Sequence, residues 1–153
     1  MKLPDAIGFS ATDIIIRPLK ARWYEVVKDV LILIHLDDGT TIKLHIKAGF
    51  KFDGRSGGWI FDLLLPNLGN QRYCACVLVH DALCHEIGIS YPMTNWLFKG
   101  MLIHAPVAKW RAKVAYKGIS TGDWYFGAKT PQEVQNSTLC YVEWTPQSSH
   151  LGR

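Results

Sequence analysis

The stretch VLILIHLDDGTTIKLHIKAGFKF, residues 30–52, joins a β-branched apolar run to an alternating run through an Asp-Gly pair. Asp-Gly between two runs of this kind is a strong signal for a β-hairpin. From residue 41 onward apolar and polar residues alternate, which is typical of a strand with one buried face. We therefore predict two antiparallel strands, over residues 30–36 and 41–52.

The polar face of the second strand is basic and consists of Lys43, His45, Lys47 and Lys51. A row of lysines on a strand is usually a solvated face that prevents edge-to-edge association, and an anion-binding surface is the alternative. No aromatic residue interleaves with these lysines, as a stacking platform for bases requires. Since the net charge of the chain is only +4, we do not expect a nucleic-acid partner.

The chain downstream of the hairpin turns to helical patterns. Residues 53–72 form a glycine-rich passage, in which we expect one short helix around 59–65, before Pro66. Residues 73–86 are compatible with a helix that stops near Gly88. This helix is the first long one that the sequence predicts.

A second helical region follows. Pro92 suits the first turn of a helix that runs to about residues 117–118, and Pro106 should kink or divide it. A hairpin followed by helices predicts an α+β domain, with a small antiparallel sheet packed on two or three helices. We expect this domain to span residues 1–127, followed by an extended tail over 128–153.

The tail contains one segment with strand character. Residues 138–144, TLCYVEW, alternate between two faces, whereas the remainder of 128–153 is polar and rich in turn-forming residues. Such a segment cannot bury enough surface to order itself. We expect it to add as a strand to an open sheet edge, either on its own domain or on a neighbouring subunit.

The N-terminus lacks the apolar core of a secretory signal, and the longest apolar run, residues 30–36, is too short to span a membrane. We therefore expect no membrane span and a cytoplasmic site of synthesis, where thiols stay reduced.

Residues 78–86, LVHDALCHE, place titratable side chains in an otherwise apolar helix. With helical spacing, Cys76, His80 and Cys84 share one face and could hold a metal ion. The alternative is that the cysteines pack as small hydrophobic residues, as buried cysteines usually do. No C-x-x-C pair occurs, so we predict neither a metal nor a cofactor.

His80 and Asp81 need partners outside this helix, because a buried carboxylate must be paired or hydrogen-bonded. The glycine-rich passage offers Asp53, Arg55 and Ser56. We predict that Asp53 meets the His80–Asp81 pair in space, and that Arg55 pairs with Asp81 or Asp53. The cluster is either a structural lock or a catalytic site.

Three blocks of the sequence, AGFKFDGRS at 48–56, VLVHDALC at 77–84 and SYPMTNWLF at 90–98, resemble the motifs of a family of unknown function, DUF1353, found widely in tailed phages and prophages. The resemblance covers roughly residues 30–118 and includes His80 and Asp81. Asn95 stands where the family usually has Asp, and Tyr91 where it has Arg. The family brings no settled activity; the resemblance implies a phage or prophage origin.

Two functions remain open. In the first, the chain is a tail-associated structural or interaction component of the virion, with other virion proteins or a second copy as partners. It would be made in the host cytoplasm and carried in the virion. In the second, it is a small hydrolase acting on the cell envelope. His80 would be the general base, since an imidazole titrates near neutral pH. Asp53, Asp81 and Ser56 would complete the catalytic group, and Arg55 and Asn95 would bind the ligand.

Overall fold

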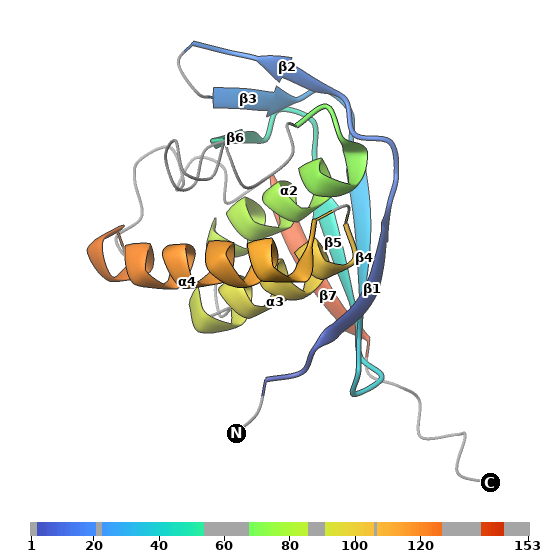
Figure 1. Ribbon diagram of the computed structural model, residues 1–153. Helices are drawn as coiled ribbons and strands as arrows, with labels where there is room; N and C mark the ends of the chain where they lie inside the picture. The colour runs from blue at the N-terminus through green and yellow to red at the C-terminus, as the bar shows by residue number, and fades with distance from the viewer. Residues whose placement is uncertain are drawn as a thin grey trace, which may run out of the picture.

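The computed structural model describes residues 3–20, 23–53, 68–85, 91–105, 107–126 and 139–145 (Figure 1). In chain order, the elements are β1 (Ala6–Ala11), β2 (Ile16–Pro18), β3 (Trp23–Val26), β4 (Val30–Leu36), β5 (Thr41–Ile46), β6 (Lys51–Asp53), α2 (Gln71–His85), α3 (Tyr91–Ile103), α4 (Lys109–Phe126) and β7 (Cys140–Thr145). The fold is α+β, as predicted. Two antiparallel sheets, ordered β1-β4-β5-β7 and β2-β3-β6, lie beside the helices, which cover one face of the larger sheet.

The predicted hairpin is present as β4 and β5. Its register runs from Val30 opposite Ile46 to His35 opposite Thr41. The Asp-Gly turn forms because the backbone N–H of Thr40 donates to the Asp38 carboxylate at 2.8 Å, and this hydrogen bond lowers the pKa of Asp38. The inward-facing side chains of both strands are completely buried at the centre of the hairpin: Ile32, Ile34, Ile42 and Leu44.

The predicted strand over residues 41–52 is wrong in its length, because the chain turns at Gly49. This residue has a φ of 98°, which favours glycine, and its N–H donates to the Val26 carbonyl at 2.7 Å. The chain then continues as β6, which pairs with β3 in the second sheet. Phe50 and Phe52 are fully buried, so the alternation of the sequence persists across the turn and conceals it.

Helix α2 is the central helix of the fold. It begins after Asn70, whose side-chain oxygen accepts a hydrogen bond from the backbone N–H of Tyr73 at 3.0 Å, as an N-cap does. Every residue from position 73 to position 80 is buried. A helix that is buried all round must place any polar side chain of that stretch in the interior. His80 is such a side chain.

The second helical region is divided, as predicted from Pro106, which itself lies outside the described residues. Helix α3 ends at Ile103 and α4 begins at Lys109. The prediction that the helix stops near 117–118 is wrong, since α4 continues to Phe126. Gly118 lowers helix propensity by about 1 kcal/mol but does not forbid a helix.

The strand predicted in the tail is confirmed as β7, which adds antiparallel to β5 of its own domain. Cys140 lies opposite Ile46, and its thiol points to the Ala82 carbonyl of α2 at 3.8 Å. The short helix predicted around 59–65, and Gly88, lie outside the described residues. Within the described part of the chain, no helix is long and apolar enough to cross a membrane.

Candidate functional site

His80 lies where α2 meets α3, and its side chain is almost fully enclosed, with 6% of the residue exposed. Its Nε2 is 2.8 Å from the Asn95 side-chain oxygen. The Phe98 ring packs against the imidazole with the ring centroids 5.0 Å apart. Asn95 and Phe98 are three positions apart on α3 and so face the same way. One face of α3 therefore supplies both a polar and an apolar contact to the same imidazole.

Asp81 approaches the other side of the ring. Its Oδ1 lies 3.6 Å from His80 Nδ1, which is longer than a hydrogen bond but close enough for electrostatic attraction. The carboxylate therefore favours a proton on Nδ1. The Asp81 side chain is 15% exposed, compared with 8% for that of His80, so Asp81 retains some contact with solvent.

The contact between His80 and Asn95 tolerates both charge states of the imidazole. An imidazolium donates from Nε2 to the amide oxygen. A neutral ring protonated on Nδ1 instead accepts from the amide NH₂ after the amide turns over. With either arrangement of the proton, the same 2.8 Å contact joins α2 to α3.

The buried polar side chains of the described residues all lie on α2 or α3: His80, Thr94 and Asn95. Thr94 is fully buried and Asn95 is 2% exposed. Burying a polar group costs free energy of folding unless the group is hydrogen-bonded. These residues therefore mark the helix pair in which the interior of the protein is polar.

The structure brings together only part of the predicted site. His80, Asp81 and Asn95 meet, although the sequence assigned Asn95 to ligand binding and not to His80. Asp53 belongs to β6, whose backbone contacts α2. The Asp53 side chain, and all of Arg55 and Ser56, lie outside what the structure describes, so the expected meeting of Asp53 with the His80–Asp81 pair stays a prediction.

Sequence reasoning missed Phe98 and Thr94. Thr94 and Asn95 are polar residues inside the largely apolar helix α3, and that signal could have identified Asn95 as a partner for His80 of α2. Nothing in the sequence alone distinguishes Phe98 from the other apolar residues of α3.

Cys74 and Cys76 of α2 behave as buried apolar residues. Desolvation raises the pKa of Cys74 to about 12 and raises the pKa of Cys76 still further, even though Arg72 attracts the thiolate form. The Cys76 thiol donates to the Arg72 carbonyl at 3.3 Å. Metal ligation needs a thiolate, and the described residues contain no group of three or more His, Cys, Asp or Glu that could hold a metal ion. The Cys84 side chain lies outside the described set.

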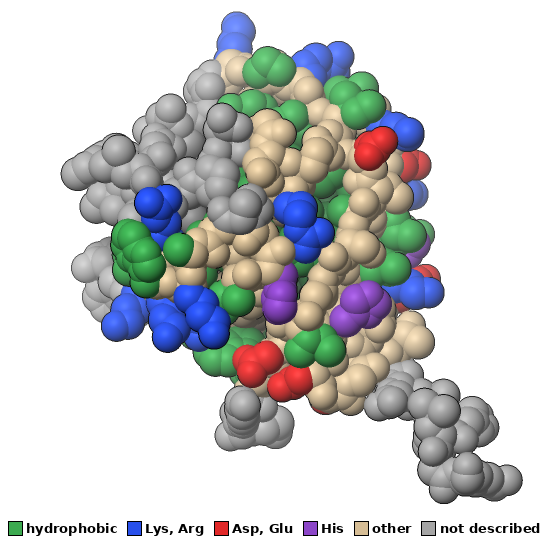
Figure 2. All heavy atoms as spheres, turned by 45° about the vertical axis from the view of Figure 1, so that its right-hand side comes forward, with side chains coloured by type: hydrophobic (Ala, Val, Ile, Leu, Met, Phe, Trp, Pro, Cys, Tyr) green, Lys and Arg blue, Asp and Glu red, His purple; other side chains and the backbone are tan. Residues whose placement is uncertain are grey.

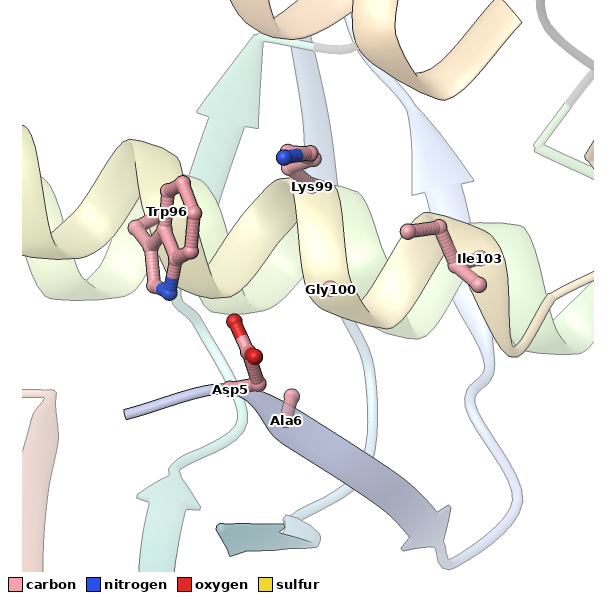
Figure 3. Close-up of a pocket in the computed structure, with 6 residues that line it drawn as sticks. All are labelled: Asp5, Ala6, Trp96, Lys99, Gly100 and Ile103. Atoms are coloured by element: carbon pink, nitrogen blue, oxygen red, sulfur yellow. The ribbon is translucent and has the colours of Figure 1, made fainter. Parts of the chain in front are cut away.

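Figure 3 shows a surface cavity whose lining includes none of His80, Asp81 and Asn95. It measures about 320 Å³ and lies between the start of β1 and α3, lined by Asp5, Ala6, Trp96, Lys99, Gly100 and Ile103. A Cβ on Gly100 would come within 2.9 Å of the Ala6 Cβ, so glycine is what lets β1 pack this closely on α3. Trp96 follows Asn95 in sequence but turns away from His80, and its indole N–H donates to the Pro4 carbonyl at 3.1 Å.

Comparison with known families gives one match. A family described as "Protein of unknown function (DUF1353)" matches residues 27–119, which is more than half of the chain. The matched segment begins just before β4, ends within α4 and contains the whole His80 cluster. Among curated proteins and solved structures, none matches the chain.

Proposed function

The chain belongs to the DUF1353 family, and from this premise we propose that it is a tail-associated structural or interaction protein of a phage or prophage virion. The observation that carries the structural assignment is the enclosed His80 ring, 6% exposed and hydrogen-bonded to Asn95 at 2.8 Å. The phage origin is supported by the resemblance of the three motif blocks to proteins of tailed phages and prophages. The expected locations are the host cytoplasm during synthesis and then the virion.

The geometry around His80 suits a lock better than a general base. A catalytic base must lie within hydrogen-bond reach of the proton that it removes. Here Nε2 faces Asn95 and Nδ1 faces Asp81, so protein groups stand at both nitrogens. The ring joins α2 to α3, and α2 in turn contacts β6 of the second sheet. The His80–Asn95 contact therefore connects α2 to α3.

The edge of the larger sheet supports an interaction role. In the described part of the chain β7 is an edge strand, and it exposes two aromatic side chains, Tyr141 and Trp144, each 44% exposed. Edge strands present backbone groups to which another chain can add. Aromatic residues are enriched where proteins meet. We therefore expect another virion protein, or a second copy of this chain, at β7.

The variant His80→Gln separates the structural from the catalytic function. Glutamine places an amide N–H near the position of Nε2 and can keep the hydrogen bond to Asn95, but it cannot act as a general base. We expect H80Q to fold, to enter particles and to preserve infectivity, whereas His80→Ala should accumulate to a lower level than the wild type. The measurement is mass spectrometry of purified particles together with plaque titre. Loss of infectivity in particles that contain normal amounts of H80Q would contradict a purely structural role, and absence of the wild-type chain from particles would contradict the virion assignment.

A hydrolase acting on the cell envelope is the second candidate, and the approach of Asp81 to His80 Nδ1 at 3.6 Å favours it. An acid at Nδ1 orients an imidazole that works through Nε2. In this function Asp53 and Ser56 complete the catalytic group, and Arg55 and Asn95 bind the ligand. The hydrogen bond between Asn95 and His80 Nε2 must then break when the ligand binds. Incubation of purified peptidoglycan with the protein tests it. Release of soluble fragments by the wild-type protein but not by H80Q would support the enzyme.

A further inference from the structure

The helical hairpin of α3 and α4 is free of acidic residues over a long stretch of sequence. No Asp or Glu occurs between Glu86 and Asp123, whereas residues 109–118 alone, KWRAKVAYKG, contain four cations. These cations are exposed on α4: Lys109, Arg111, Lys113 and Lys117. Because α4 offers no acid of its own along 109–118, this part of the helix is a strongly cationic surface.

The apolar residues of this segment divide between two opposite sides of α4. Ala112 and Ala115 are fully buried and form the side that faces the body of the protein. Trp110 and Val114, one turn apart, are 58% and 44% exposed and point the other way. The outermost ridge of α4 is therefore apolar, although it faces solvent.

The cations flank this apolar ridge. With helical spacing, Lys113 lies on one side of the line from Trp110 to Val114, and Arg111 lies on the other. The Arg111 guanidinium carbon is 5.3 Å from the centre of the Trp110 ring. At the lower left of Figure 2, blue Lys and Arg side chains gather over α4 beside green hydrophobic ones. A tryptophan-bearing ridge between two cationic flanks is the pattern of helices that lie in a membrane interface.

The basic strand face predicted from the sequence, which includes Lys43 and Lys51, differs from α4 in having acids across the strand pairs. Lys43 lies opposite Glu143 of β7, and Lys51 lies opposite Glu25 of β3. Opposite charges directly across a strand pair attract one another. Two lysines of the sheets thus have an acid directly across the strand pair, whereas residues 109–118 of α4 contain no acid.

We propose that the exposed face of α4 docks on a lipid surface that bears anionic headgroups. The occupant is argued from charge complementarity and from shape. A convex ridge can bring Trp110, Val114 and both cationic flanks to a plane at once, with the rings and methyl groups at the headgroup boundary and the cations at the phosphates. A nucleic acid fits less well, because Val114 has no role in phosphate contacts and Arg111 already covers part of the Trp110 ring. This docking is peripheral and does not depend on the proposed virion role.

Sedimentation of the purified full-length protein with vesicles tests the proposal. One set of vesicles is phosphatidylcholine alone and the other is equal parts phosphatidylcholine and phosphatidylglycerol. We expect binding to the anionic vesicles only, weakened by added salt. Trp110→Ala should weaken it roughly tenfold, since the interfacial anchor is lost. Trp144→Ala, which removes an exposed tryptophan from β7, is the matched control and should bind as the wild type does.

Reversing charges on α4 is the second test of the proposal. Lys109→Glu with Lys113→Glu should abolish vesicle binding. Lys28→Glu with Lys47→Glu makes the same change in net charge at other exposed positions and should retain most of the binding. Circular dichroism of each variant confirms that it is folded. Equal loss in both double variants, no binding to anionic vesicles at low salt, or binding to duplex DNA in place of vesicles would each overturn the proposal.

Discussion

Two histidines of this protein, one at the α2–α3 interface and one on the outer face of the sheet, each contact a partner from another element, but in opposite surroundings. His80 is enclosed and lies 2.8 Å from Asn95. The His45 side chain is 29% exposed and lies 3.3 Å from Glu143, which is 56% exposed, while its ring stacks on Tyr141 with the centroids 4.3 Å apart. Each imidazole packs against an aromatic ring and has a carboxylate nearby, yet we expect the buried pair to matter far more for stability.

The reason is what replaces the lost contact when one side chain of a pair is removed. An exposed histidine exchanges its carboxylate partner for water, and such pairs contribute about 0–1 kcal/mol. A buried imidazole or amide cannot replace its partner by water, so loss of the partner lowers the free energy of unfolding by about 1–3 kcal/mol for the unsatisfied group alone. The surroundings therefore decide the energetic role of a histidine more than the number of its contacts does.

The largest expected effect is that of His80→Ala. It removes the ring that packs on Phe98, leaves a cavity and takes the 2.8 Å imidazole partner from the buried Asn95 side chain, so the free energy of unfolding should fall by about 3–4 kcal/mol. Urea unfolding followed by circular dichroism measures it. His45→Ala is the matched control on the sheet and should change the stability by less than about 1 kcal/mol. Similar losses in both variants would show that burial does not separate the two sites.

A buried thiol of α2 should make the stability of the fold depend on alkaline pH. Burial raises the pKa of Cys74 to about 12, from an ordinary value of 9.0, so the folded state holds a proton that the unfolded state releases. The resulting stability is fully present below the unfolded pKa and is lost as the pH rises through the folded one. Between about pH 8 and pH 10.5 this should cost about 2 kcal/mol. Comparison of the wild type with Cys74→Ala at the two pH values checks it, because the variant should lose less; an identical loss in both would contradict it.

A smaller effect is expected from Asp81→Ala. The carboxylate is 15% exposed on its side chain and stands 3.6 Å from His80. Its removal should lower the free energy of unfolding by about 1–2 kcal/mol, between the values for fully buried and for exposed partners. Asp81→Asn is the matched variant, because it keeps the shape and removes the charge. If thermal melts of both variants coincide with the wild type, Asp81 does not support the fold, and the hydrolase becomes the better function.

The smallest effect is expected from Glu143→Gln on the sheet. This change removes the charge opposite His45 and Lys43 but keeps β7 in place, so stability should change by less than about 0.5 kcal/mol. Its influence should shrink further at high salt, because exposed charges are screened. Chemical unfolding at low and high salt measures both. A loss as large as that of His80→Ala would mean that the edge strand depends on this charge.

Much of the fold could be predicted because local signals and tertiary structure agree. The Asp-Gly turn, the alternation of the hairpin, the break near Pro106 and the strand of the tail each have a local physical cause. The turn at Gly49 could not be predicted, since the residues on either side bury alternate side chains in two different sheets. A period-two pattern records which residues are buried but not which sheet buries them.

The candidate site was only half predictable for a similar reason. His80 and Asp81 were identified because polar side chains in an apolar helix need partners. The partner of His80 proved to be Asn95, fifteen positions away on the next helix. Helix packing brings these residues together, and the relative rotation of two helices is fixed by the shapes of all their contacting side chains. No short motif contains that information.

A double-mutant cycle on His80 and Asn95 tests whether this pair is a structural lock between α2 and α3. The four proteins are the wild type, His80→Ala, Asn95→Ala and the double variant, with the free energy of unfolding measured by urea denaturation for each. We predict a coupling energy of about 1–2 kcal/mol, since the second substitution removes a group whose contact across the two helices the first has already removed. Strictly additive losses, with a coupling energy near zero, would contradict the lock and show that the two side chains support the fold independently.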